Sequence, residues 1–227
     1  MQSTEFLVAV FTFIVLLFSL TVHECAHAWV ASRLGDQTAR SMGRVSLNPM
    51  DHIDPIGTLL IPGLAIFGPF IGLGFLGRFV FGWAKPVPIL SRNFRNYRRD
   101  DILVSMAGPA SNLLLSILAF AGLCAVYMAA SKLPEGVDPS TTMQALDQLF
   151  TIGFQLNLVL CVFNLLPIPP LDGSHVLRQF LSYNAVQAYD RITGVASYLL
   201  LILVGPMVLG VVMTPLMKLA YSILYRI

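Results

Sequence analysis

His23, Glu24 and His27 form an H-E-x-x-H pattern inside an apolar stretch of the chain. Four residues advance about 400° around a helix axis, so the two imidazoles lie on one face, one turn apart. This spacing suits two ligands of one tetrahedral metal ion, and Glu24 stands where a general base for a water molecule is needed. Such side chains are costly at membrane depth and are usually functional there. The pattern therefore predicts a hydrolytic metal centre.

A hydrolytic zinc site usually has three protein ligands and one open position, so a third ligand must come from elsewhere. Asp172 ends the stretch that starts at Asn164, in which three prolines interrupt a helix. We predict Asp172 as the third ligand. Alternatively, its side chain only caps a helix that follows, because Asp is a good N-cap residue. His175 is the rival third ligand, and His52 is interpreted as a loop residue near the mouth of the site.

The amino-acid composition indicates the class of protein, and the surroundings, in which these residues lie. Apolar residues make up 56% of the 227 positions and charged residues only 11%, against about 45–50% and about 25% in soluble domains. A disordered chain is excluded by the apolar content, and three cysteines are too few for a disulfide scaffold. The net charge of +2 gives no indication of a nucleic-acid partner. The lipid bilayer is therefore the predicted surrounding of much of the chain.

Four apolar tracts predict membrane spans: residues 6–22, continuing to about 34, then 102–130, 150–167 and 192–216. The last contains two prolines, so it is either one kinked span or two short ones. Arginines follow the first and third spans and precede the second, which predicts cytoplasmic loops there and an outer N-terminus. Residues 56–81 lie between two such loops and are rich in glycine, which indicates a re-entrant segment.

Together these tracts predict an all-α polytopic membrane protein with about four to six transmembrane helices and a re-entrant segment. Residues 81–89 are expected to add a short β-hairpin-like element on the cytosolic side. A single transmembrane domain is expected over residues 1–227, with a core at about 5–182 and a C-terminal helical tract at 188–227.

Three motifs in this order carry a family resemblance: H-E-x-x-H in the first span, Ala107-Gly108-Pro109-x-x-Asn112 at the start of the second, and Asn164-x-x-Pro167 leading to Leu171-Asp172-Gly173. The chain resembles the site-2 protease family of intramembrane zinc metalloproteases, in its small prokaryotic branch without a PDZ or CBS domain. The resemblance implies a site within the cell membrane, towards the cytosol.

The resemblance also implies roles for single residues. His23, His27 and Asp172 would bind one Zn²⁺ per chain, and Glu24 would activate water. Asn164 would hold the substrate or the oxyanion. The expected partners are a transmembrane protein or peptide substrate and the lipid bilayer, whereas the sequence predicts neither the substrate's identity nor the oligomeric state.

A substrate helix hides its carbonyl groups in hydrogen bonds and must unwind before attack. We expect the edge of Lys85, Pro86 and Val87 to hold the opened strand by β-augmentation, although a loop that merely packs on the first span is the alternative. Asn112 and Asn157 are interpreted as hydrogen-bonding between helices. Two other classes of function stay open, a metal transporter or sensor and an inactive relative that acts as a binding protein.

Overall fold

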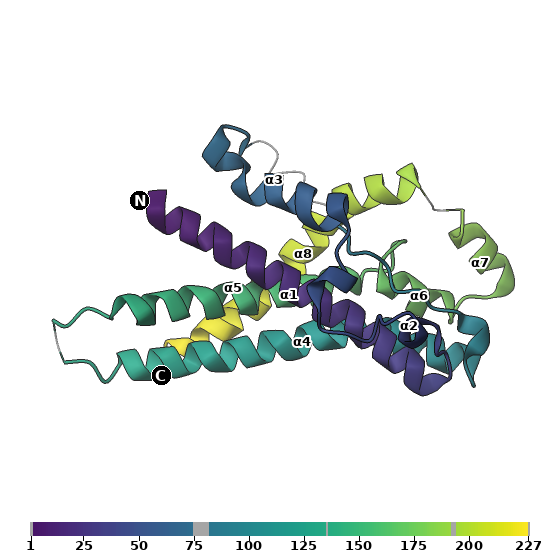
Figure 1. Ribbon diagram of the computed structural model, residues 1–227, viewed down its shortest axis with the longest axis horizontal. Helices are drawn as coiled ribbons and strands as arrows, with labels where there is room; N and C mark the ends of the chain where they lie inside the picture. The colour runs from purple at the N-terminus through teal and green to yellow at the C-terminus, as the bar shows by residue number, and fades with distance from the viewer. Residues whose placement is uncertain (1, 75–81, 135, 192–193, 227) are drawn as a thin grey trace.

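Four long helices run along the main axis of the computed structural model, which describes residues 2–74, 82–134, 136–191 and 194–226. They are α1 (Gln2–Leu34), α4 (Tyr97–Ala130), α5 (Thr141–Asn164) and α8 (Val195–Leu224) (Figure 1). Each is long and apolar enough to cross a membrane, for which about 20 residues are needed. The prediction of an all-helical, multi-pass protein is confirmed. From Val195 onwards, the last apolar tract forms one helix, with Pro206 and Pro215 inside it.

Short elements connect these helices. They are α2 (Thr38–Ser41), the 3₁₀ turn η1 (Pro49–Asp51), the π-helical turn η2 (Pro55–Leu60), α3 (Ile61–Phe67), the 3₁₀ turns η3 (Gly68–Ile71) and η5 (Ser91–Asn93), α6 (Asp172–Arg178) and α7 (Tyr183–Tyr189). In Figure 1, α2, α6 and α7 lie at the end of the bundle opposite to the loop that joins α4 and α5.

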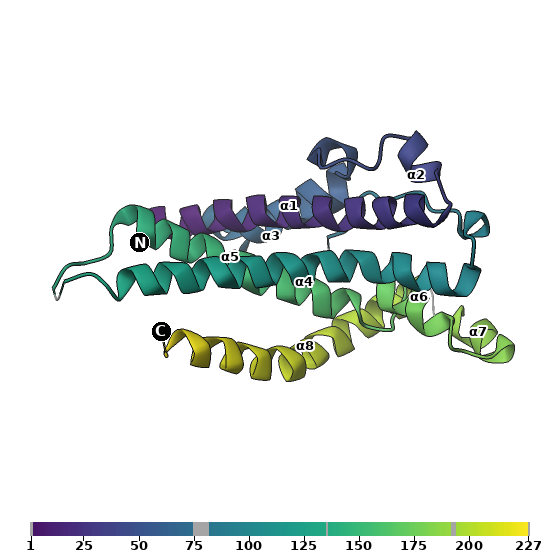
Figure 2. The same cartoon turned by 90° about the horizontal axis from the view of Figure 1, so that it is seen from below.

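Helix α4 is the centre of the bundle and packs against α1, α5 and α6. Its buried face is small and polar, with Ser105, Gly108, Asn112 and Ser116 one turn apart. Between helices in lipid, small side chains allow close approach and polar side chains form interhelical hydrogen bonds. Figure 2 shows α8 on the other side of α4 and α5 from α1, where α8 packs on α5. The polar face of α4 is thus enclosed by protein.

The predicted re-entrant segment runs through η2, α3 and η3 beside the N-terminal half of α1 (Figure 1). The ring of Phe67 packs against Phe6 and Phe13 of α1, with centroids 6.0 and 5.6 Å apart. Residues 75–81 lie outside the described residues, and the chain that follows them contacts the beginning of the segment. There Trp83 N–H donates to the Gly57 carbonyl at 3.0 Å. The two ends of the segment therefore lie side by side, and its re-entrant course in the membrane stays a prediction.

The described residues 82–90, here called the strap, contain no β-strand, so the predicted β-hairpin-like element is wrong for this part of the chain. Pro86 and Pro88 have no N–H group to donate to a ladder. Four of the other amides of the strap pair with other segments: Trp83 with Gly57 O (3.0 Å), Lys85 with His52 O (2.9 Å), Val87 with Glu24 Oε2 (3.2 Å) and Leu90 with Asp36 Oδ2 (2.8 Å).

Asp36 lies just after the end of α1 and holds the C-terminal end of the strap at Leu90. The side chain is fully buried, and its oxygens accept hydrogen bonds from Thr38, from Leu90 N–H and from Asn93 Nδ2 at 2.6–2.8 Å. Burial raises the pKa of this carboxyl group, but the hydrogen bonds outweigh burial and lower the pKa below its usual value. Asp36 therefore fixes the strap through its ionised form.

Candidate metal centre

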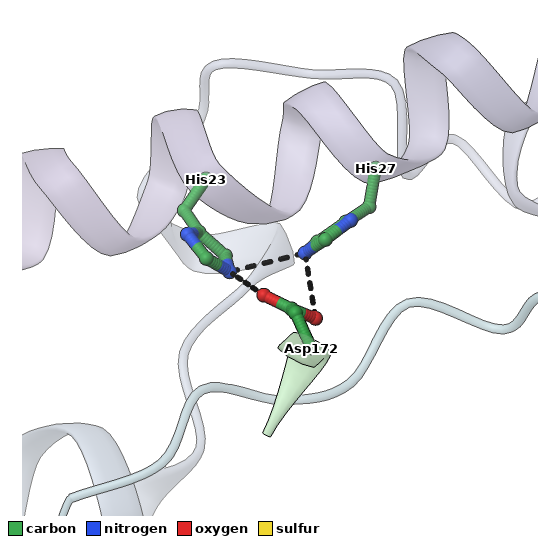
Figure 3. Close-up of side chains that lie close together, drawn as sticks. All are labelled: His23, His27 and Asp172. Atoms are coloured by element: carbon green, nitrogen blue, oxygen red, sulfur yellow. Dashed lines mark hydrogen bonds and ion pairs between the residues drawn. The ribbon is translucent and has the colours of Figure 1, made fainter. Parts of the chain in front are cut away.

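His23 and His27 project from one face of α1 towards each other and towards Asp172 (Figure 3). Their Nε2 atoms are 3.0 Å apart, and both side chains are buried. The opposite ring nitrogens bond to α4: His23 Nδ1 lies 2.6 Å from Asn112 Oδ1, and His27 Nδ1 lies 2.7 Å from the Val104 carbonyl oxygen. Because that carbonyl can only accept, His27 Nδ1 carries the proton and its Nε2 presents a lone pair.

Asp172 reaches this pair from α6, far along the chain. Its carboxylate oxygens lie 3.2 Å from His23 Nε2 and 3.4 Å from His27 Nε2. Leu171 is the N-cap residue of α6 and Asp172 is the first helical residue, so Asp172 does not occupy the capping position, and its carboxylate faces the imidazoles. A Cβ atom on Gly173 would overlap the Leu165 carbonyl. The glycine therefore lets the turn after α5 close tightly enough to bring Asp172 inwards.

The three donors fit a metal ion. Ligand atoms about 2.0–2.1 Å from a tetrahedral Zn²⁺ lie about 3.3 Å from one another, and the separations here are 3.0–3.4 Å. Asp172 Oδ2 is buried and accepts no hydrogen bond. Burial raises the pKa of Asp172, but contacts with His23 and His27 in their protonated, cationic forms outweigh burial and hold the pKa well below its usual range. Lone pairs and a negative charge thus converge on one point, which suits a cation.

Within the described residues, His23, His27 and Asp172 are the one group of three His, Cys, Asp or Glu side chains close enough to hold a metal ion. His175, the rival ligand, is exposed on α6 and is not part of the group. His52 is buried in the loop after α2, where its Nε2 lies 2.9 Å from the Ser46 carbonyl oxygen. Its interpretation as a loop residue agrees with this position.

Gly108 allows α4 to approach the two imidazoles. A Cβ atom at this position would lie 2.5 Å from His23 Nε2 and would also overlap His27 Nε2, whereas ordinary contact begins at 3.4 Å. Both rings are held by hydrogen bonds to α4 itself, so they cannot simply move aside. Glycine is therefore required where the helix passes the candidate metal centre.

Glu24 lies next to the histidines but is held by the strap. Its Oε2 atom accepts the Val87 N–H at 3.2 Å, and its side chain is partly exposed. The buried Arg44 holds the same part of the strap from the carbonyl side, with its Nη2 2.7 Å from Lys85 O and 3.3 Å from Pro86 O. The strap is thus clamped between a cation and the carboxylate of Glu24.

Asn164 ends α5, and its Nδ2 donates to the Leu160 carbonyl of the same helix at 2.9 Å. No described contact ties it to the metal ligands. Asn112, by contrast, contacts one of the three candidate metal ligands. The sequence predicts a contact between helices for Asn112, and Asn112 does bond Asn157 of α5, but it also forms a hydrogen bond with His23 of α1. Its spacing of four residues from Gly108 was the signal that both belong to the face of α4 that meets the histidines.

Comparison with known proteins identifies the class that this fold and site define. The model of peptidase family M50 matches residues 11–205. The chain therefore belongs to peptidase family M50, the site-2 protease family, and is a multi-pass membrane metalloprotease.

Three relatives illustrate the similarity. The chain is 42% identical over 168 residues to YwhC of Bacillus subtilis, named as a candidate zinc metalloprotease, and covers 68% of that protein with 74% of its own length. It is 34% identical over 172 residues to Rip2 of Mycolicibacterium smegmatis (58% of that protein, 76% of this chain) and 31% identical over 108 residues to MJ0611 of Methanocaldococcus jannaschii (49% and 47%), which are named in the same way. No solved structure matches the chain.

Proposed function

We propose that this protein hydrolyses peptide bonds within or near the transmembrane segments of membrane-protein substrates, as a step of regulated intramembrane proteolysis. One Zn²⁺ per chain is held by His23, His27 and Asp172. The observation that carries the proposal is the convergence of these three donors, 3.0–3.4 Å apart, inside a bundle of apolar helices. The relatives named as zinc metalloproteases support zinc as the metal.

When bound, Zn²⁺ supplies a Lewis acid that lowers the pKa of water to about 7 and polarises a carbonyl group. Glu24 takes a proton from the attacking water and later delivers it to the leaving amine. The Val87 N–H, which donates to Glu24 Oε2, holds the carboxylate in place for this transfer. Asn164 is partly exposed at the end of α5, and the second hydrogen of its amide is proposed to stabilise the oxyanion.

The substrate backbone is proposed to lie along Lys85, Pro86 and Val87. These residues have a non-helical backbone and are at least partly exposed, and Val87 adjoins the proposed base. An unwound substrate segment would gain main-chain hydrogen bonds there. The amides of Lys85 and Val87 and the carbonyls of Lys85 and Pro86 already have partners, and Pro86 has no N–H group. Pairing must therefore use the Val87 carbonyl or exchange these bonds.

The proposed location is the plasma membrane, with the metal centre towards the cytosol. His23 lies 21 positions after the first residue of α1, Gln2, and 11 positions before its last, Leu34. It is therefore in the C-terminal half of this helix. The end of the bundle nearest to it carries Arg33, Arg40 and Arg44 and the arginines of residues 92–99. Basic residues of this kind mark cytoplasmic loops.

The direct test incubates the purified protein in detergent with a tagged membrane-spanning peptide, with and without a metal chelator. Cleavage should require zinc. Glu24→Gln should keep the metal content of the wild type and lose cleavage, whereas His23→Ala and Asp172→Ala should lose metal. Full zinc occupancy in either of the last two variants would remove that residue as a ligand.

A metal transporter is the competing function, and reconstituted vesicles separate the two. Zinc flux into proteoliposomes without peptide cleavage by the same preparation would contradict the protease proposal. Cleavage that persists in Glu24→Gln would leave a protease but remove Glu24 from its mechanism.

A further inference from the structure

A chain of buried hydrogen bonds runs from α5 through α4 to the first histidine. Asn157 Nδ2 donates to the Gly153 carbonyl at 2.9 Å. Asn112 Nδ2 donates to Asn157 Oδ1 at 3.0 Å, and Asn112 Oδ1 lies 2.6 Å from His23 Nδ1. The exposed fractions of Asn112, Asn157 and His23 are 0%, 3% and 5%. Water therefore does not compete for these groups, and each must find its partner within the protein.

The direction of this chain is determined at its α5 end. The Gly153 carbonyl can only accept, so Asn157 must turn its NH₂ group towards it and its Oδ1 towards Asn112. Asn112 must then offer its NH₂ group to Asn157 and its Oδ1 to His23. An amide oxygen can only accept, and His23 Nδ1 therefore carries the proton. The lone pair of the imidazole is left on Nε2, the atom that faces His27 and Asp172.

We propose that Asn112 and Asn157 are positioning residues that hold His23 in the tautomer able to bind the metal. This inference rests on the proposed metal centre and adds two residues from outside the ligand set. His27 reaches the same state through a backbone carbonyl, that of Val104, which cannot rotate. His23 instead depends on the side-chain amide of Asn112, whose Nδ2 donates to Asn157 Oδ1 at 3.0 Å and to the Ser19 carbonyl at 3.5 Å. Without Asn157, only the longer bond to Ser19 opposes rotation of this NH₂ group towards the ring.

The test measures the dissociation constants of Zn²⁺ and Co²⁺ for the full chain in detergent, by competition with a chelator and from the visible absorption of bound Co²⁺. Loss of a hydrogen-bond partner behind a ligand costs about 10–100-fold in metal affinity. Asn112→Leu should weaken Zn²⁺ binding by about that factor and change the Co²⁺ spectrum. Asn157→Leu should act in the same direction. In a protein that already carries Asn112→Leu, adding Asn157→Leu should reduce the Zn²⁺ affinity little further, because the two residues act on His23 through one hydrogen bond.

Asn112→Asp separates positioning from packing. A carboxylate still accepts the His23 N–H, whereas its second oxygen faces Asn157 Oδ1 without a donor, so metal affinity should be recovered in part relative to Asn112→Leu. A residue that only packs α4 against α5 would predict the reverse order, since a buried charge is worse than leucine between apolar helices. Asn112→Asp with weaker metal binding than Asn112→Leu would therefore overturn the proposal.

Ser116→Ala is the matched control. Ser116 is one turn further along α4, is 1% exposed and donates to the Phe154 carbonyl of α5 at 2.9 Å. The substitution removes a bond between the same two helices without touching His23, so it should lower thermal stability and leave metal affinity unchanged.

The outcomes distinguish this inference from the proposed function. Failure of the wild type to bind Zn²⁺ would remove the metal centre itself. Wild-type Zn²⁺ binding that is lost in His23→Ala but unchanged in both Asn112→Leu and Asn157→Leu would remove only the positioning role. An equal loss of metal affinity in Ser116→Ala would also contradict that role.

Discussion

Replacing Gly108 by alanine should damage the metal centre through a single methyl group. The new Cβ would lie 2.5 Å from His23 Nε2, which is about 0.9 Å short of the 3.4 Å at which ordinary contact begins. Metal–ligand distances tolerate only about ±0.2 Å. The rings cannot retreat without losing the Nδ1 hydrogen bonds that hold them to α4. We expect the affinity for Zn²⁺ to fall by more than about tenfold, or 1.4 kcal/mol.

The assay is Zn²⁺ affinity in detergent, by competition with a chelator, together with thermal stability. Gly122→Ala is the matched control on the same helix, because its Cβ would lie 2.6 Å from the Phe150 ring. Overpacking of this kind costs about 1–3 kcal/mol of stability. At about 1.5 Å per residue, Gly122 is about 21 Å along α4 from Gly108, so Gly122→Ala should be destabilised and keep its zinc.

Wild-type Zn²⁺ affinity in Gly108→Ala would refute this reasoning, since it would mean that α4 can move away from the histidines at little cost. A similar loss of zinc in Gly122→Ala would refute it too, because overpacking anywhere in α4 would then be sufficient. The distinguishing result is loss of stability in both variants and loss of zinc in Gly108→Ala alone.

Three further predictions concern the surroundings of the site. Asp36→Asn should lower the free energy of unfolding at neutral pH by about 1–3 kcal/mol, because buried donors lose their acceptor. The folded pKa of Asp36 is lowered, so its contribution is present above the unfolded value of about 3.9 and is lost as pH falls through the folded pKa; denaturation followed against pH should show the two proteins converging in acid. Val87→Pro removes the N–H that Glu24 accepts and should lower turnover of a membrane-spanning peptide with zinc retained, whereas unchanged turnover would favour a strap that only packs. His175→Ala should leave the zinc content by elemental analysis unchanged, and loss of zinc would restore His175 as a ligand.

Much of the fold could be predicted from the sequence because its physical cause is local. A run of apolar residues long enough to span a bilayer dictates a helix, since backbone groups in lipid must bond within the segment. The glycines and prolines of residues 56–81 predict an interrupted segment, and the described residues 55–71 form three short helical elements in place of one long helix. The prediction of a β-hairpin-like element at residues 81–89 is wrong for the described residues 82–89, and the reason is non-local. The amides of Lys85 and Val87 are taken by other segments of the chain.

For the candidate site, the sequence alone determined the pair of imidazoles, because i and i+4 share a helix face wherever that helix lies. For the third ligand, the sequence could only favour Asp172 over its rival His175. Whether this carboxylate lies near His23 depends on how α4, α5 and α6 pack, and the structure places it 3.2 Å away. The partner of His23 Nδ1 was likewise decided by the tertiary structure, which brings Asn112 to the ring. Spacing along a helix follows from local geometry, whereas meetings between distant segments follow from packing.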